Sequence, residues 1–493
     1  MPITFAHPIR HVFVLMLENR SFDHLFGLSG IPGIDAATAA NACPLPGGAA
    51  ISFSGGAPAT MPTDPEHEFG SVVEQLCGPG VTFPPTHIYP PISNRGFVAS
   101  YARTFKTPTP ARADVAYIMA GVDTPVQAPA IDRLAKNYVL CDKWFSSLPG
   151  PTWPNRFFVH GASSAGLEHS PTAPDIALWE TLSGFRYPNG SVYDRLGNGN
   201  WRLYQDKSGP ISGQIPQVGA LHRINGGDVK DLDRFAADLA GGYTYAYTFI
   251  EPAYGDLIAN SYQRGSSQHP RDGLAAGDRL VARIYNSIRQ SPLWPQSLLL
   301  ITYDEHGGFY DHCAPPVAPA PADNPPPGHN KSGFDFTRYG VRVPAIVVSP
   351  WVAKGAVDSV TRDHASVAAT LTSLFGMAPL TQRDRAAASL SSLLKPAARP
   401  DADCPASITG ATDPIAPAAQ PIAIANAAQP VPEGSNLQAF LYVVRKAHAE
   451  AGARPDSFVA QNFAPAPTSR SPVTIGQAQA YIEQMAPHLF GAK

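Results

Sequence analysis

Two pairs of polar residues each follow an apolar run of the sequence. Glu18-Asn19 comes directly after residues 11–17, and Asp304-Glu305 follows Tyr303 at the end of a second run. Hard divalent cations bind several oxygen ligands, drawn from carboxylates and amides that converge from different segments. These four residues could provide such a set.

The surroundings of the two pairs favour a site over a structural role. An isolated acidic residue at such a place is more often a helix N-terminal acid or a turn cap. Here Gly307-Gly308 permits close backbone approach, and His306 and His312 add ionisable groups. Two acidic pairs with neighbouring histidines therefore indicate a metal site.

Thr152 lies in a sharp turn that leads into a predicted helix. Pro154 is suited to an early helical position, and Thr152 falls near the cap. A threonine there commonly does no more than cap the helix. A helix N-terminus also offers free N–H groups to a phosphate, so the Thr152 hydroxyl is well placed for covalent phosphoryl transfer.

Three histidines lie in polar or turn-like contexts instead of on apolar stripes. They are His67 in Asp64-Pro-Glu-His, His222 in Leu221-His-Arg223 and His269 in Gln268-His-Pro270. Most of the 15 histidines of the chain are expected to be structural or exposed. Judged from spacing alone, each of the three is more often a structural or exposed residue than a functional one.

The elements that must position these residues form an α/β pattern. Buried strands are predicted at His11 to Leu17, Ser297 to Thr302 and Ala345 to Val348, and helices at Gly277 to Ile288 and His364 to Phe375. Strands that alternate with helices predict an α/β fold with a mostly parallel sheet sandwiched by helices. Such sheets bind ligands outside the carboxyl ends of their strands, which is where both acidic pairs fall.

The chain divides into a large N-terminal part and a smaller C-terminal one. We expect a catalytic domain over residues 1–395, with loop-rich lid insertions at Leu28 to Val81 and Ala314 to Pro327. Residues 396–433 are rich in Pro and Ala and predict a linker or wrapping arm. Residues 434–493 predict a C-terminal helical extension, with helices at 436–451 and 474–489, the second opened by a Thr474-x-x-Gln477 capping box.

Composition excludes several classes of protein. The 493 residues are 44% hydrophobic, with 36 basic and 39 acidic side chains and a net charge of -3, so a largely disordered chain is excluded. Charged residues make up only 15%, and no basic region suggests nucleic acid. No apolar run is long enough to cross a membrane or to form the core of a signal peptide. The five cysteines show no Cys-x-x-Cys spacing, so neither a zinc ribbon nor a disulfide framework is indicated.

Taken together, the motifs resemble those of the bacterial phosphoesterase family that joins phospholipases C and a group of acid phosphatases, within the alkaline-phosphatase superfamily. The resemblance spans residues 5 to 376. It rests on Glu18-Asn-Arg-Ser-Phe-Asp-His24, Asp64-Pro-Glu-His67, Gly150-Pro-Thr-Trp-Pro-Asn-Arg156, Gln268-His-Pro270, Thr302-Tyr-Asp-Glu-His-Gly-Gly-Phe-Tyr-Asp-His312 and Val341-Arg-Val-Pro-Ala-Ile-Val-Val-Ser-Pro350.

The resemblance implies an alkaline-phosphatase-like fold and assigns roles to residues. Glu18, Asn19, Asp304 and Glu305 match the family's metal ligands. Thr152 matches its nucleophile, which is threonine in the phospholipases and serine in the acid phosphatases. His67 and His269 match histidines that contact the phosphoryl group, and His222 is a looser match by position. These are the site residues we expect.

The expected reaction is a two-step displacement at phosphorus. Thr152 attacks phosphorus, and a protonated histidine, His269 or His222, gives its proton to the leaving alkoxide. Water then hydrolyses the phosphothreonine. A divalent ion is the expected cofactor: calcium, magnesium and manganese suit the oxygen ligands, and the superfamily also uses zinc. The family is commonly exported, although without a visible leader the default expectation is a cytoplasmic protein.

The leading hypothesis is a phospholipase C that acts on phospholipids and contacts a membrane surface only transiently. The alternatives are a broad acid phosphomonoesterase with the same site, or a catalytically silent protein that binds phosphorylated ligands or a partner. Every matched position keeps a chemically competent side chain, which argues against the silent protein. The two enzymes differ in whether the lid insertions offer an acyl docking surface.

Overall fold

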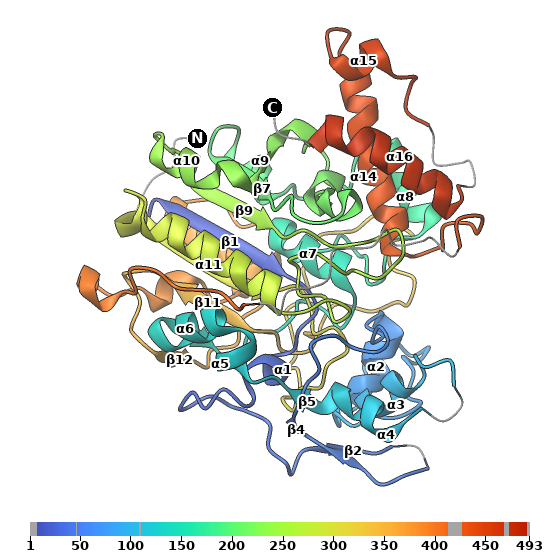
Figure 1. The fold of residues 1–493 in the computed structure, drawn as a ribbon, viewed down its shortest axis with the longest axis vertical. Helices are drawn as coiled ribbons and strands as arrows, with labels where there is room; N and C mark the ends of the chain where they lie inside the picture. Colours follow the sequence, from blue (N-terminus) through green and yellow to red (C-terminus); the bar gives the residue numbers. More distant parts are fainter. Residues whose placement is uncertain (1–6, 46, 108–109, 413–425, 468–472, 491–493) are drawn as a thin grey trace.

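An eight-stranded sheet of order β12-β6-β11-β10-β1-β9-β7-β8 forms the centre of the protein. The computed structural model describes residues 7–45, 47–107, 110–412, 426–467 and 473–490 (Figure 1). The strands of this sheet are β1 (His11–Leu17), β6 (Val139–Cys141), β7 (Trp201–Gln205), β8 (Val229–Asp231), β9 (Tyr247–Glu251), β10 (Ser297–Tyr303), β11 (Ala345–Val348) and β12 (Ala356–Asp358).

The three predicted strands are confirmed as β1, β10 and β11, and the sheet is mostly parallel. β1 pairs in parallel with both β9 and β10. β11 is the exception, because it runs antiparallel to β10 and to β6. The end of β11 therefore lies at the edge of the sheet opposite to the ends of β1 and β10.

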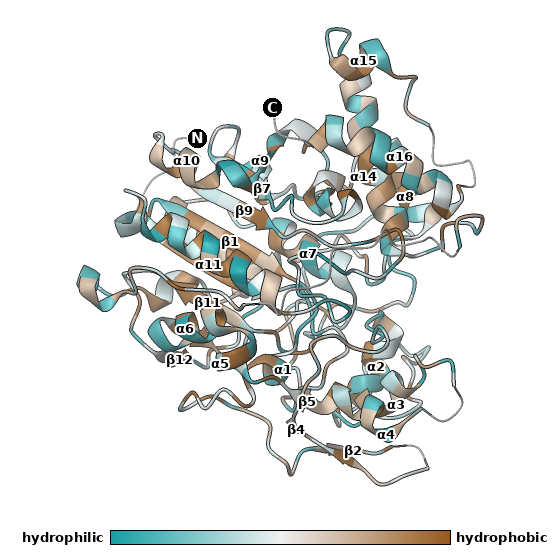
Figure 2. Cartoon of the chain, viewed as in Figure 1, coloured by the Kyte–Doolittle hydropathy of each residue, from teal (hydrophilic) through white to brown (hydrophobic). Residues whose placement is uncertain are grey.

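Helices cover both faces of the sheet, as predicted for an α/β fold. All residues of β1 and β10 are buried, which requires a layer on each side. α6 (Pro129–Asn137), α10 (Phe235–Ala240) and α11 (Ala275–Arg289) form one contacting group, and α7 (Thr152–Gly161) packs on α12 (Ala365–Phe375). In Figure 2 the strand β1 is brown, whereas α11 alternates between brown and teal, as expected for a helix with one buried face.

The prediction that Leu28 to Val81 is a loop-rich lid without core is wrong. The segment contains β2 (Ala42–Cys43), β3 (Ile51–Ser52), β4 (Ser54–Gly55) and the helix α2 (Phe69–Cys77). Together with α3 (Phe97–Ala102) and α4 (Arg112–Ala116) this segment builds a lobe with its own buried cluster, which includes Phe53, Val72, Leu76 and Phe97. The abundance of Pro and Gly concealed these widely spaced apolar residues.

The C-terminal part packs on the catalytic part. Residues 405–411 run along α11, where Tyr285 Oη donates to Pro405 O (2.5 Å) and Asn286 Nδ2 donates to Ile408 O (2.9 Å). Residues 413–425 of the predicted arm lie outside the described residues. Both predicted C-terminal helices are present as α14 (Asn436–Gly452) and α16 (Ile475–Phe490), and Gln477 N donates to Thr474 Oγ1 as the capping box requires.

Short elements complete the fold. None of the described helices is long and apolar enough to cross a membrane. The shorter helices and remaining strand are α1 (Phe22–Phe26), β5 (Ala120–Gly121), α5 (Thr124–Gln127), α8 (Ala173–Thr181), α9 (Val192–Leu196), α13 (Gln382–Ala386) and α15 (Phe458–Asn462), with 3-10 turns at Tyr117–Met119, Ile211–Gln214, Gln217–Ala220, Gly226–Asp228, Leu232–Arg234, Trp294–Gln296, Leu390–Leu393 and Asp401–Asp403.

Candidate active site

The register of β1 against β10 brings the two acidic pairs together. Leu17 is the partner of Tyr303, so the residues that follow them, Glu18 and Asp304, leave the sheet side by side. Asn19 N donates to Asp304 Oδ1 (3.0 Å), and Asn19 Nδ2 donates to Glu305 Oε1. The four oxygen-bearing side chains proposed from the sequence therefore form one group at the carboxyl edge of the sheet.

Two glycines allow other segments to reach this group. A Cβ on Gly307, which has φ +61°, would lie 2.3 Å from Asn19 O. A Cβ on Gly308 would lie 2.7 Å from Pro65 Cβ. Only glycine tolerates both the left-handed backbone and the close contact at Gly307. Gly307 and Gly308 therefore allow Asn19 to pack on one side and the segment that carries Asp64 and His67 to pack on the other.

The group concentrates negative charge away from water. Burial raises the pKa of Glu18 to about 8, with Asp304 and Glu305 adding to the rise and Arg156 opposing it. Burial also raises the pKa of Asp304 to about 6. Glu18 Oε2 and Asn19 Oδ1 are buried and have no hydrogen-bond partner among the described residues. Unpaired oxygens on crowded carboxylates fit a divalent cation, which would supply the missing partner and the missing positive charge.

Arg156 is a member of this group to which the sequence assigned no role. Its Nε lies 3.0 Å from Asp304 Oδ2, and both side chains are fully buried. Its Nη2 donates to Met16 O (3.2 Å) and Leu17 O (3.1 Å), so one guanidinium holds α7 against the end of β1. His364 Nε2 lies 2.7 Å from Asp304 O and fixes the other side of the turn.

Thr152 is the first residue of α7, one helical turn before Arg156. Residues four apart share a helix face, so Thr152 lies on the side of α7 that Arg156 turns towards Asp304. Pro151 occupies the N-cap position, and the threonine is therefore not the capping residue that the structural alternative required. The side chain is buried at the start of a ten-residue helix, where free N–H groups favour an anion.

His269 faces Asp64 across a short gap. Its Nε2 lies 3.7 Å from Asp64 Oδ1, and neither atom has a hydrogen-bond partner among the described residues. Arg271 N donates to Nδ1 (3.3 Å), which leaves the proton of the neutral ring on Nε2. Burial, with His67 contributing, holds the pKa of His269 well below its usual value, so the ring is neutral and its Nε2–H points at the gap.

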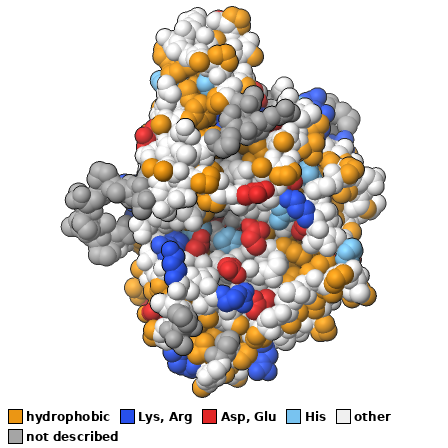
Figure 3. All heavy atoms as spheres, turned by 90° about the vertical axis from the view of Figure 1, so that its right-hand side faces the viewer, with side chains coloured by type: hydrophobic (Ala, Val, Ile, Leu, Met, Phe, Trp, Pro, Cys, Tyr) orange, Lys and Arg blue, Asp and Glu red, His pale blue; other side chains and the backbone are white. Residues whose placement is uncertain are grey.

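His67 differs from His269 in its protonation. Its ring centroid lies 6.5 Å from that of His269. Burial lowers the pKa of His67, but the charges of Glu305, Asp64 and Glu68 outweigh burial and raise it to about 9. The structure thus supplies one cationic and one neutral histidine. Figure 3 shows acidic, basic and histidine side chains gathered in the middle of one face, between the C-terminal helices and the α2–α4 lobe.

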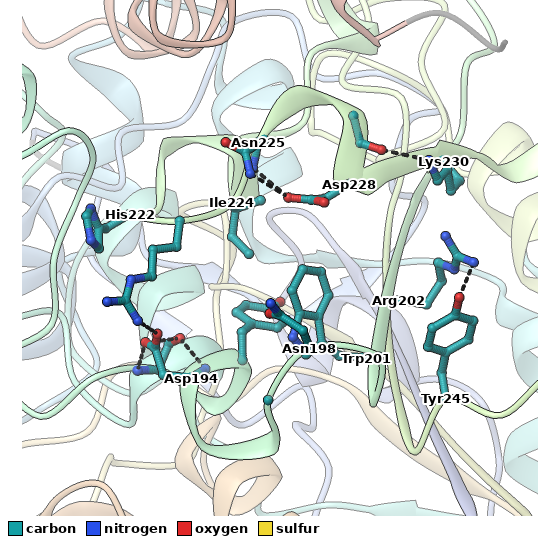
Figure 4. A pocket seen from close by; sticks show the side chains of 16 residues that line it. Asp194, Asn198, Trp201, Arg202, His222, Ile224, Asn225, Asp228, Lys230 and Tyr245 are labelled. Atoms are coloured by element: carbon teal, nitrogen blue, oxygen red, sulfur yellow. Dashed lines mark hydrogen bonds and ion pairs between the residues drawn. The ribbon is translucent and has the colours of Figure 1, made fainter. Parts of the chain in front are cut away.

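The structure does not bring His222 to this group. His222 lines a polar pocket of about 910 Å³ with Trp201 and Tyr245, which lie at the amino ends of β7 and β9 (Figure 4). Arg186 Nη2 lies 3.1 Å from its Nε2. Because β7, β9 and β1 are parallel, this pocket is at the edge of the sheet opposite to Glu18. The expectation for His222 is corrected accordingly.

A second cluster of potential metal ligands, formed by Asp23, Asp311 and His312, is already neutralised. Arg342 pairs with Asp23 (3.2 Å) and with Asp311 (2.8 Å), and both side chains of each pair are fully buried. His312 Nδ1 lies 2.6 Å from Asp23 Oδ2. The charges of these carboxylates raise the pKa of His312 to about 9 despite its burial, so the metal-free cluster balances two carboxylates against two cations.

Comparisons with known proteins identify the family of the chain. The model of the Phosphoesterase family matches residues 9–378. Non-specific phospholipase C6 of Arabidopsis thaliana is 35% identical over 81% of this chain and 74% of its own length, and non-specific phospholipase C3 of the same plant is 30% identical over 82% and 76%. Phospholipase C B of Mycobacterium tuberculosis is 26% identical over 75% and 74%. A solved protein of the alkaline phosphatase superfamily from Vibrio parahaemolyticus overlaps 56% of this chain and 65% of its own, at 11% identity and a TM-score of 0.32.

Proposed function

The chain belongs to the Phosphoesterase family and is a phosphoric ester hydrolase, and from that premise we propose that it is a phospholipase C. The reaction cleaves the bond between phosphate and the glycerol oxygen of a phospholipid, and it releases diacylglycerol and a phosphorylated head group. The relatives named phospholipase C support the substrate class. The observation that supports the chemistry is the buried acidic group at the ends of β1 and β10, which Arg156 joins to α7, the helix that begins at Thr152.

Glu18, Asn19, Asp304 and Glu305 would hold a divalent cation. When bound, the ion supplies positive charge that stabilises the developing charge of the phosphoryl oxygens. Calcium, magnesium, manganese and zinc are all compatible with this ligand set in proteins, and elemental analysis of the purified enzyme would identify the ion.

Thr152 is the proposed nucleophile. Thr152 reacts as its alkoxide, which the second step regenerates: its oxygen forms the bond to phosphorus while the bond from phosphorus to the diacylglycerol oxygen breaks, so the head group remains attached to Thr152 through the phosphate. Water then cleaves the threonine ester and frees the phosphorylated head group. The N-terminal N–H groups of α7 lie next to the new phosphodiester and favour its negative charge.

The two histidines have different proposed roles. His67, which has the carboxylates of Asp64 and Glu68 beside it to favour its protonated form, donates a proton to the leaving alkoxide and takes one from water in the second step. His269 is neutral, and its Nε2–H, which has no acceptor among the described residues, is proposed to donate to a phosphoryl oxygen. His67 therefore replaces His269 and His222 as the proposed acid.

The test uses phosphatidylcholine in mixed micelles beside a soluble phosphomonoester. We expect the wild-type enzyme to release phosphocholine, Thr152→Ser to retain measurable turnover, and Thr152→Ala to lose several orders of magnitude. Acid quenching should trap a phosphocholine group on residue 152 of the wild type.

Hydrolysis of the phosphomonoester alone would replace the phospholipase by the phosphomonoesterase alternative. Full activity of Thr152→Ala would remove the nucleophile assignment.

A further inference from the structure

The first residue of α14 connects two parts of the proposed active site. Asn436 Oδ1 accepts a hydrogen bond from Trp153 Nε1 (2.9 Å), and Asn436 Nδ2 donates one to Tyr262 Oη (2.9 Å). α14 lies outside residues 9–378, which the family model matches. A segment beyond the matched region thus hydrogen-bonds to two residues within it.

Each of these two residues adjoins a group proposed to act on the substrate. Trp153 follows Thr152 in the first turn of α7 and is fully buried. The ring of Tyr262 stacks on that of His269, with centroids 3.7 Å apart and planes 11° apart. Tyr262 has φ +55°, a left-handed conformation that a tyrosine rarely adopts without support from its surroundings.

The start of α14 is itself held in place. Ser435 caps the helix by accepting from Gln438 N, and Gly434 N donates to Gln438 Oε1 (2.9 Å). Phe440, one turn into the helix, packs edge-on against Trp153 with ring centroids 5.2 Å apart. The Asn436 amide is therefore a fixed point and not a mobile side chain.

We propose that Asn436 is a positioning residue that sets the His269 ring relative to the Thr152 hydroxyl. An amide can accept from an indole N–H and donate to a phenol oxygen at once, so the single side chain defines the separation of Trp153 and Tyr262. Through them it fixes the start of α7 and the plane of His269. This inference assigns the C-terminal helices to the same catalytic unit as α7. It rests on the proposed function.

The experiment compares full-length Asn436→Leu with Asn436→Asp. Leucine removes both hydrogen bonds at similar size, whereas aspartate can accept from both Trp153 Nε1 and the Tyr262 hydroxyl. A displacement of about 1 Å at a reacting group costs up to about 100-fold in rate. We expect Asn436→Leu to lower kcat by about 10- to 100-fold with KM changed less than about twofold, and Asn436→Asp to recover most of that loss.

Two further variants separate positioning from folding. Tyr262→Phe keeps the stacked ring and removes only the hydroxyl that Asn436 contacts. If Asn436 acts through Tyr262, the kcat losses of Tyr262→Phe and Asn436→Leu will combine to less than their product. Asn462→Leu, at an exposed asparagine of α15, is the matched control and should leave kcat unchanged.

The amplitude of the cooperative unfolding transition gives the folded fraction of each variant, so each kcat refers to folded enzyme. A wild-type kcat in folded Asn436→Leu, or strictly multiplicative losses with Tyr262→Phe, would overturn this inference and leave the phospholipase intact. If Asn436→Leu does not fold, Tyr262→Phe decides: a lowered kcat supports the inference, and a wild-type kcat overturns it. A wild-type enzyme that hydrolyses no phosphoester would overturn the proposed function, and this inference with it.

Discussion

Replacing Arg156 by Met tests the electrostatic description of the site. The side chain pairs with Asp304 at 3.0 Å, and the two groups are 1% and 0% exposed. Its removal leaves the Asp304 carboxylate buried beside Glu18 and Glu305 with no compensating charge. Loss of one partner of such a pair costs about 3 to 5 kcal/mol of unfolding free energy.

The loss should depend on pH in a defined direction. Arg156 lowers the pKa of Asp304 and of Glu18, so both pKa values rise further when it is removed. Asp304 has a pKa of about 6 in the wild type, and towards pH 5 it becomes neutral in both proteins. An unpaired charge then no longer has to be buried in the variant. We expect the destabilisation to be larger at pH 8 than at pH 5.

The assay is denaturant unfolding of the metal-stripped protein, followed by tryptophan fluorescence at both pH values. Arg283→Met is the matched control, since Arg283 pairs with Asp233 at 2.7 Å but the two side chains are 40% and 80% exposed. Exposed pairs contribute at most about 1 kcal/mol. Equal losses in the two variants at pH 8, or a loss in Arg156→Met that does not change with pH, would refute the reasoning.

Two other predictions concern protons. The pKa of His312 is raised to about 9, so it stabilises the fold fully below its unfolded pKa near 6.5 and loses this effect as pH rises to about 9. His312→Gln should therefore lose about 1 to 2 kcal/mol at pH 6, after screening by solvent, and the thermal midpoints of the two proteins should approach each other by pH 10. Glu18 must be deprotonated to bind a cation, and calorimetric titration of magnesium or calcium into stripped enzyme should show affinity falling up to about tenfold per pH unit below the Glu18 pKa of about 8. An affinity that is constant between pH 8 and pH 6 would exclude Glu18 as a ligand.

The sequence predicted the central strands and the acidic group for a clear physical reason. Strands buried on both faces appear as continuous apolar runs, and the ends of parallel neighbours meet at one edge. Glu18 and Asp304 could therefore be paired before their distance was known. The orientation of β11 could not be predicted, because an apolar run has the same pattern in parallel and antiparallel pairing.

His222 and Asn436 show where sequence reasoning ends. The polar context of His222 resembles that of His67, but its place depends on β7 and β9, which fix the pocket at the far edge of the sheet. The link from Asn436 to Trp153 joins residues 283 positions apart, and no periodicity or motif carries that information. Arg156 gave a weak signal, one turn after Thr152 in a predicted helix, but the spacing says nothing of its ion pair with Asp304, which is 148 positions away.

The central place of β1 in the sheet has a consequence during synthesis. This strand, HVFVLML, leaves the ribosome early, yet both neighbouring strands follow more than about 200 residues later. At about 5 to 20 residues per second, β1 waits on the order of 10 to 50 s for β9, and longer for β10. Throughout that interval the nascent chain carries an unpaired apolar strand, which is prone to aggregation. We therefore expect chaperones to bind this segment before the active site forms.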